Sequence, residues 1–139
     1  MNPISCKIYL YQKGGSFMSE YPNPLGPYSI SRIEGNVLYL SSQLPVDPAT
    51  GDVSSDFKVQ CQQAFTNIKC ILQDNHLDMN AIFKLTIYLN DISQFNHLND
   101  MMLQLFEKPY PTRTVVQVGA LPQNASIGIE ACANLLSPT

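Results

Sequence analysis

The stretch AIFKLTIYLN, residues 81–90, alternates between apolar and polar side chains along most of its length. Successive residues of an extended chain point to opposite sides, so this pattern separates the side chains onto two faces. One face would carry Phe83, Leu85, Ile87 and Leu89, and the other Lys84, Thr86, Tyr88 and Asn90. The stretch therefore predicts a strand that is buried on one side only.

Helical patterns flank this strand on both sides. Before it, a helix is predicted from a cap at Ser54 or Ser55 to about Asn75, with its apolar residues on one stripe. The stripe is Cys61, Ala64, Phe65, Ile68, Ile71 and Leu72. After it, a second helix is predicted over about residues 92–107, ended by Pro109 and Pro111. Its buried side would be Ile92, Phe95, Leu98, Met102, Leu105 and Phe106.

Four more strands complete the pattern. Residues 28–33 and 37–43 form a predicted hairpin, and residues 113–118 and 126–135 follow the second helix. The order ββαβαββ predicts an α+β two-layer sandwich, with both helices on one face of a mixed sheet. The opposite face also needs cover, and small or apolar residues in the last strand (Ala131, Cys132, Ala133) predict that an oligomer buries it.

Length and composition limit the classes of function. The 139 residues fit one domain, taken as residues 19–139 after an N-terminal extension of residues 1–18. A net charge of −3 with eight scattered Lys and Arg residues argues against a nucleic-acid partner. No apolar run approaches the ~18–20 residues that span a bilayer, so no membrane partner is expected. The four cysteines form no CxxC pair and are expected to be reduced thiols, which predicts a cytoplasmic protein.

Arg113 is the most informative single residue for function. It follows Pro111 and begins a β-branched run at the predicted mouth of a strand. A guanidinium group presents a rigid fork of donors that fits a carboxylate bidentately and stays charged at any working pH. Arg113 is therefore a candidate anchor for a small organic acid. The alternative is an exposed arginine that pairs with a surface carboxylate.

Five segments in unbroken order resemble the Rid family, the reactive-intermediate deaminases also called the YjgF family. The resemblance extends from about residue 20 to residue 135, and it is specific because the segments occur together at the family's spacing. The segments are Gly26-Pro27-Tyr28-Ser29, Ser41-Ser42-Gln43-Leu44-Pro45 with the loop 47–51, Asn67-Ile68-Lys69, Pro111-Thr112-Arg113-Thr114, and Leu121-Pro122 followed by Ile129-Glu130-Ala131.

The resemblance implies a chorismate-mutase-like fold that assembles as a homotrimer with a ligand cleft between neighbouring subunits. It implies hydrolysis of enamine and imine intermediates, such as 2-aminoacrylate, to 2-keto acids and ammonia. The partner would be a small 2-imino or 2-keto acid, and neither a cofactor nor a metal is expected.

The resemblance also assigns roles to individual residues. Arg113 corresponds to the arginine that holds the substrate carboxylate, and Tyr28 to the tyrosine that lines the cleft near the carboxylate and the imine. Asn99 corresponds to a family asparagine on the second helix. Ser41, Ser42 and Gln43 fall where the end of a strand donates backbone hydrogen bonds to the ligand.

The chain departs from the family where the reaction needs a water. Deaminase members hold that water with the first glutamate of a Glu-Ile-Glu motif, and here the position is Gly128. Glu130 lies two residues further on the same strand face, roughly 7 Å away. It is a candidate for a water or proton relay, or else a structural carboxylate. Ser42 stands where the family usually has glycine, and Val115 where some members have a reactive cysteine.

Three functions remain open. The first is hydrolytic deamination of imines, with Arg113 and Tyr28 as the catalytic candidates. The second is a non-catalytic member that binds small carboxylates, because Gly128 replaces the glutamate that positions water. The third is an endoribonuclease, which the negative net charge and the lack of a basic stripe argue against.

Overall fold

The computed structural model describes residues 21–137, so the predicted extension, residues 1–18, lies outside the described residues. The strands are β1 (Ser31–Glu34), β2 (Val37–Gln43), β3 (Ile82–Leu89), β4 (Thr112–Gln117) and β5 (Ile127–Asn134). The helices are α1 (Phe57–Asp74) and α2 (Phe95–Leu105). Short 3₁₀ turns cover Met79–Ala81, Ile92–Gln94 and Pro122–Asn124. The predicted order ββαβαββ is confirmed.

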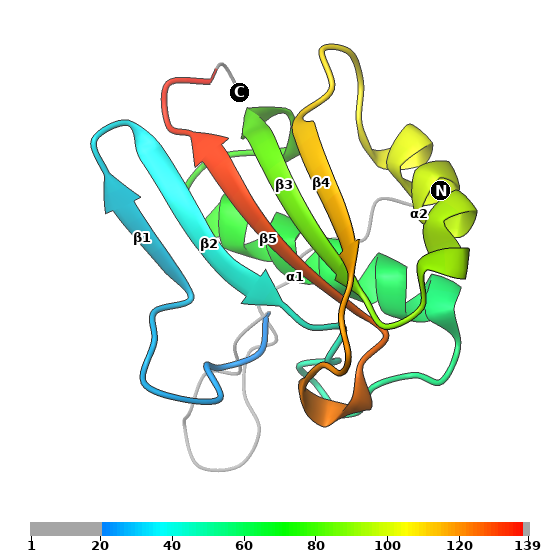
Figure 1. The fold of residues 1–139 in the computed structure, drawn as a ribbon. Coiled ribbons are helices and arrows are strands. Elements are labelled where there is room, and N and C mark those ends of the chain that lie inside the picture. Colours follow the sequence, from blue (N-terminus) through cyan, green and yellow to red (C-terminus); the bar gives the residue numbers. More distant parts are fainter. Residues whose placement is uncertain (1–20, 138–139) are drawn as a thin grey trace.

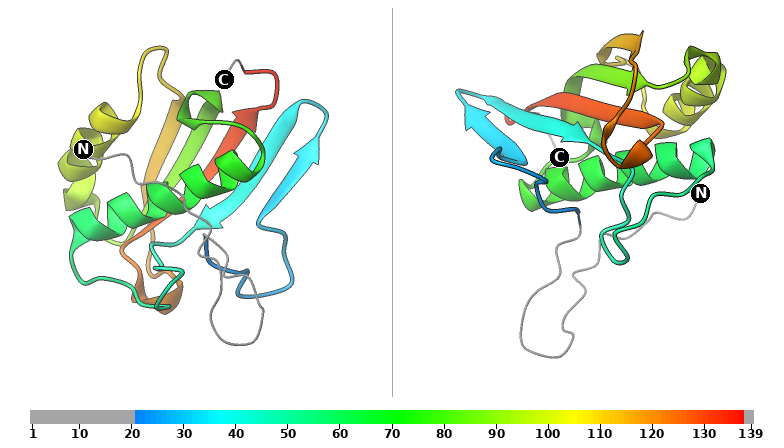
Figure 2. Two further views of the ribbon diagram at one scale, coloured as in Figure 1. Left: turned by 180° about the vertical axis from the view of Figure 1, so that it is seen from behind. Right: turned by 60° about the horizontal axis from the view of Figure 1, so that its bottom comes forward.

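The sheet is mixed, as predicted. Its strand order is β1-β2-β5-β3-β4, in which β3 and β4 run parallel and all other neighbours run antiparallel. Helix α1 lies across one face of the sheet, and α2 lies beside β4 at the end of the sheet (Figures 1 and 2). The result is a two-layer α+β sandwich whose other sheet face carries no helix within the described residues.

The core fills the space between α1 and the sheet. Helix α1 contributes the buried residues of the predicted stripe, from Cys61 to Leu72, and the sheet contributes every second residue of β2, β3 and β5. Three polar residues are also buried (Gln43, Gln60 and Asn67), and Asn67 is 0% exposed. Its side-chain amide donates to the carbonyl oxygens of Leu44 and Val46, both at 3.0 Å, which ties the segment after β2 to the helix.

The predicted starts of the first helix and of the first strand were wrong. Helix α1 is capped by Asp56, not by Ser54 or Ser55, because an Asp56 carboxylate oxygen accepts a hydrogen bond from the backbone N–H of Val59. The first strand begins at Ser31, not at residue 28, because a tight turn holds the chain there. In that turn the backbone N–H of Tyr28 donates to the carbonyl oxygen of Gly26.

The second helix is shorter than residues 92–107. Its first three predicted residues form the 3₁₀ turn Ile92–Gln94, capped by the side chain of Asp91, and α2 ends at Leu105. Leu98, Met102 and Phe106 are buried as predicted, whereas Ile92 is 45% exposed. The change from a 3₁₀ turn to an α-helix alters the residue spacing, so a single helical stripe misplaces the first turn.

The alternation over residues 81–90 is also broken at its start. The register of β3 against β5 shifts between Ile82 and Lys84, so Ile82 is buried and Phe83 is 44% exposed. A bulge of this kind rotates the residues before it relative to those after it. Leu85, Ile87 and Leu89 are buried as predicted.

The small residues of β5 do not mark the open face. Ala131 and Ala133 are buried toward the helices with Ile127 and Ile129, and only Cys132 of the three faces the other way, next to Lys84. The argument for an oligomer from the two alanines is therefore wrong. Their small size instead suits the close approach of α1 to the sheet.

The cysteines differ from one another. Cys61 and Cys132 are free thiols, whereas Cys70 is disulfide-bonded, so the prediction of reduced cysteines is wrong for Cys70. Burial raises the pKa of the Cys61 thiol to about 12, which keeps that thiol protonated. Across residues 21–137, no helix has the length and apolar character needed to cross a membrane.

Candidate functional site

Arg113 lies on the helix side of the edge strand β4. It pairs with Leu85 of β3, and paired residues of neighbouring strands point to the same side of a sheet. The Arg113 side chain therefore extends toward α2 and not across the open sheet face. It lines a cleft of about 370 Å³ together with Asn99, Met102, Leu103, Tyr110 and Pro111.

The guanidinium of Arg113 is held by α2. Its Nη1 donates to Oδ1 of Asn99 at 2.6 Å and contacts the sulfur of Met102 at 3.4 Å, and its Cζ lies 5.0 Å from the centre of the Phe95 ring. Within residues 21–137, no carboxylate lies within ion-pair distance of it. The alternative of a surface ion pair is therefore not observed there. Since a guanidinium has five N–H donors, several remain for a ligand.

A second cleft lies on the other side of the sheet. It measures about 590 Å³ and is bounded by the loops before β1 and after β4. Its lining includes Tyr28, Ser41, Ser42, Tyr88 and Glu130, with apolar contacts from Leu25, Leu44, Leu121 and Pro122. Four of the residues singled out in the sequence (Tyr28, Ser41, Ser42 and Glu130) therefore meet in one place.

A β-bulge brings the two serines together. Along β2 the pairing to β5 moves from Leu40 opposite Ala131 to Gln43 opposite Ile129, so Ser41 and Ser42 together lie opposite Glu130. Such an insertion turns adjacent residues toward the same side of the sheet. Both serines consequently line the cleft, which an unbroken strand would not allow.

The three residues at the end of β2 have different partners. The Ser41 hydroxyl donates to the carbonyl oxygen of Ser29 at 2.6 Å, and its backbone N–H donates to that of Ile30. Gln43 is buried, and its side-chain amide donates to the carbonyl oxygen of Ser41 at 3.2 Å. The Ser42 hydroxyl has no hydrogen-bond partner in the part of the chain that the structure describes. Ser42 is therefore the residue of the three with a free polar group at the cleft.

Tyr88 is the cleft residue that the sequence did not single out. Its hydroxyl donates to Oε1 of Glu130 at 2.7 Å. This hydrogen bond, then desolvation and the negative charge of Glu130, raises the pKa of Tyr88 above its ordinary value. The signal in the sequence was its position on the polar face of residues 81–90. Only the structure shows that this face pairs with Gly128 and Glu130 of β5.

Gly128 lies directly beside Ser42. A Cβ atom placed on Gly128 would be 3.0 Å from the Ser42 Oγ, 3.6 Å from Leu121 Cδ2 and 3.7 Å from Leu44 Cδ2. The space that a side chain at residue 128 would enter is thus partly filled by the serine. Ser42 and Gly128, the two positions at which the resemblance predicts departures from the family pattern, are therefore neighbours in the structure.

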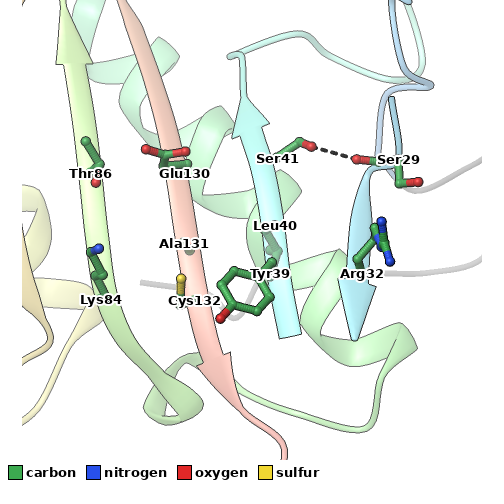
Figure 3. A pocket seen from close by; sticks show the side chains of 10 residues that line it. All are labelled: Ser29, Arg32, Tyr39, Leu40, Ser41, Lys84, Thr86, Glu130, Ala131 and Cys132. Carbon is green, nitrogen blue, oxygen red and sulfur yellow. Dashed lines mark hydrogen bonds between the residues drawn. The ribbon is translucent and has the colours of Figure 1, made fainter. Parts of the chain in front are cut away.

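A third cavity, about 440 Å³, lies further along the open sheet face. Figure 3 shows its lining, with Lys84 on β3, Glu130 and Cys132 on β5, and Tyr39 on β2. Glu130 lines both this cavity and the cleft that contains Tyr28. No group of three or more His, Cys, Asp or Glu side chains in residues 21–137 could hold a metal ion.

The predicted site residues are therefore divided in a single chain. Arg113 and Asn99 share the cleft on the helix side, and Tyr28, Ser41, Ser42 and Glu130 share the cleft on the open side. Both can bind polar ligands, since one presents a cation with free donors and the other presents hydroxyl and carboxylate groups. A ligand in one cleft does not reach the other through the sheet between them.

Comparisons with known proteins agree with this architecture. Residues 18–135 match the family model described as endoribonuclease L-PSP. A 2-iminobutanoate/2-iminopropanoate deaminase of Dermatophagoides farinae is 36% identical over 111 residues, which cover 79% of this chain and 87% of that protein. The crystal structure of RidA from an Antarctic Psychrobacter has a TM-score of 0.79 at 37% identity, covering 82% of this chain and 93% of that chain.

A crystal structure of Escherichia coli TdcF with bound serine is also similar, with a TM-score of 0.77 at 33% identity, covering 82% of this chain and 92% of that chain. These similarities confirm the predicted chorismate-mutase-like sandwich. Together, the matched family model, the related sequences and the shared fold show that this chain belongs to the Rid/YjgF family, whose family model is described as endoribonuclease L-PSP.

Proposed function

We propose that the protein hydrolyses small 2-imino acids and their enamine forms, such as 2-aminoacrylate, to 2-keto acids and ammonia. The observation that carries this proposal is Arg113, a guanidinium held by Asn99 and Phe95 with no carboxylate partner among the described residues. The similar deaminase from Dermatophagoides farinae supports the type of reaction. The structure of TdcF with bound serine supports a small ligand of amino-acid size.

In this proposal Arg113 anchors the substrate carboxylate. Asn99 and Met102 engage Nη1, so the remaining N–H groups are available for a bidentate contact. The ring of Phe95 restricts the guanidinium plane, which reduces the freedom lost when a ligand binds. The anchor places the imine carbon at a fixed distance from the carboxylate.

The groups that act on the imine come from the other cleft. Because the two clefts lie on opposite sides of the sheet, we assign them to neighbouring copies of the chain in a homotrimer, with Arg113 of one copy beside Tyr28 and Glu130 of the next. The open sheet face, with Tyr39 48% exposed, is available for such packing. Once the iminium carbon is held near a water, positioning and proton transfer are the remaining requirements.

The test is turnover of 2-aminoacrylate generated in place by a lyase that uses pyridoxal phosphate, followed as keto acid formed or semicarbazide adduct lost. Wild type should accelerate keto-acid release, and Arg113→Ala should abolish most of the acceleration while keeping the fold. Arg32→Ala is the matched control, because it removes the other arginine, which is exposed and paired with Glu34. An inactive wild type would contradict the proposal.

The second candidate is a binding protein for small carboxylates without catalysis. Gly128 favours it, because the family glutamate that positions water is absent. Calorimetry with 2-ketobutyrate decides between the two when it is combined with the turnover assay. Binding that depends on Arg113 without any turnover would establish this second function.

A further inference from the structure

The cleft that contains Tyr28 holds three polar side chains around Gly128, namely Ser42, Tyr88 and Glu130. Gly128 pairs directly with Tyr88 across β5 and β3, so the aromatic ring stands next to the position that lacks a side chain. The Tyr88 hydroxyl reaches along the same sheet face to Glu130, at 2.7 Å. On the other side of Gly128, the Ser42 Oγ lies 3.0 Å from the site of its missing Cβ.

These contacts surround the position where the family glutamate would project. Ser42 partly fills the start of the side-chain path, so a glutamate could not enter without moving the serine. Tyr88 and Glu130 are both half-buried and both line the cleft, and the Ser42 hydroxyl has no partner within residues 21–137. The Ser42 hydroxyl has a free donor, and the Tyr88 phenol oxygen has free lone pairs. The two groups can therefore bind the same water molecule.

We propose that Tyr88 is the catalytic residue that binds the attacking water and carries its proton, with Glu130 as the positioning residue behind it and Ser42 as a second ligand of the water. This inference rests on the proposed function. It assigns to a tyrosine–glutamate pair the task that other members give to one carboxylate. Tyr88, Ser42 and Glu130 all line the cleft of about 590 Å³, which is large enough to hold a water molecule beside the substrate.

Water oxygen bonds to the iminium carbon, and the C=N π pair moves to nitrogen. The water loses a proton to the Tyr88 oxygen while the Tyr88 proton passes to Glu130. The neutral carbinolamine results. Glu130 then returns a proton through Tyr88 to the amine nitrogen, the C–N bond breaks, and the carbinol O–H proton goes to the departing ammonia. The products are the 2-keto acid and ammonium, with Tyr88 protonated and Glu130 ionised as at the start.

The protonated state of Tyr88 fits this role. The hydrogen bond to Glu130 is the first cause of its raised pKa, followed by desolvation and by the charge of Glu130. The phenol therefore stays neutral at working pH and keeps its proton on the Glu130 side. Its lone pairs are left to accept a hydrogen bond from the water.

The experiment compares steady-state turnover of 2-aminoacrylate by wild type, Tyr88→Phe and Glu130→Gln. Tyr88→Phe keeps the ring and removes the hydroxyl, and kcat is expected to fall by about 10²-fold or more while KM changes less than about two-fold, because the Arg113 anchor is untouched. Glu130→Gln still accepts the Tyr88 hydrogen bond but cannot take a proton, so it should lose a similar factor in kcat. Tyr21→Phe, which removes a hydroxyl that donates to the carboxylate of Asp74 outside this cleft, is the matched control.

A rescue variant separates a catalytic role from a structural one. In the Tyr88→Phe background, the two further changes Ser42→Gly and Gly128→Glu remove the serine side chain and supply the family glutamate. The kcat of this triple variant should be at least tenfold higher than that of Tyr88→Phe alone. Wild-type turnover that persists in Tyr88→Phe and Glu130→Gln would overturn this inference and leave the proposed deaminase standing. A wild type without turnover would overturn both.

Discussion

The side-chain oxygen of Asn99 accepts a 2.6 Å hydrogen bond from Nη1 of Arg113, 14 residues later in the chain. Asn99 is on α2 and Arg113 on the edge strand β4, so this contact connects the helix layer to the sheet at the mouth of the cleft. Together with the Phe95 ring it sets the orientation of the guanidinium.

Arg113→Lys should weaken binding of 2-ketobutyrate by about 10-fold or more, although the charge is kept. An ammonium group makes one point contact in place of a planar fork, and a hydrogen bond to a charged group contributes about 1.5–3 kcal/mol. Asn99→Ala should weaken binding less, by about 5-fold, because it frees the guanidinium without removing it. Calorimetry measures both, and equal affinity in wild type and Arg113→Lys would contradict the assignment.

Gly128→Ala should destabilise the fold by about 1–3 kcal/mol, since the new Cβ would lie 3.0 Å from the Ser42 Oγ. In a Ser42→Gly background, Gly128→Ala should lower the free energy of unfolding by much less. Denaturant unfolding of wild type, both single variants and the double variant, at one protein concentration, gives the coupling free energy. A coupling of zero would show that the two residues do not compete for space.

Asn67→Ala should destabilise the protein by about 2–4 kcal/mol, because it leaves the buried carbonyl oxygens of Leu44 and Val46 without donors. Leu44 lines the cleft, so ligand binding there should weaken as well. Gln63→Ala is the control. Gln63 donates only to the Asn67 side-chain oxygen, and its loss should cost less. Equal losses for the two variants would mean that the carbonyl contacts are not the cause.

The Tyr88–Glu130 hydrogen bond should make stability fall at alkaline pH. The bond needs the protonated phenol, and it raises the folded-state pKa of Tyr88 above 10.0. Its contribution is therefore complete below pH 10.0 and is lost as the pH rises through the folded-state pKa. The difference in unfolding free energy between wild type and Tyr88→Phe, measured from pH 8 upward, should shrink above pH 10. A difference that stays constant would exclude the linkage.

The sequence alone determined the order and type of the elements. The stripe from Cys61 to Leu72 and the alternation of Leu85, Ile87 and Leu89 express local periodicities, which each segment carries in itself. The family segments likewise led to Arg113, Tyr28, Asn99 and Glu130 as candidates. Both kinds of signal are local or depend on spacing along the chain, and neither requires knowledge of how strands pair.

Only the tertiary structure decided which of these residues meet. The bulge in β2 turns Ser41 and Ser42 to one side, and the bulge in β3 turns Phe83 outward, because both depend on the register against β5. That register also sets Tyr88 opposite Gly128 and sends Arg113 to the other side of the sheet from Glu130. Inter-strand hydrogen bonds fix register between segments far apart in sequence, so no local pattern contains it.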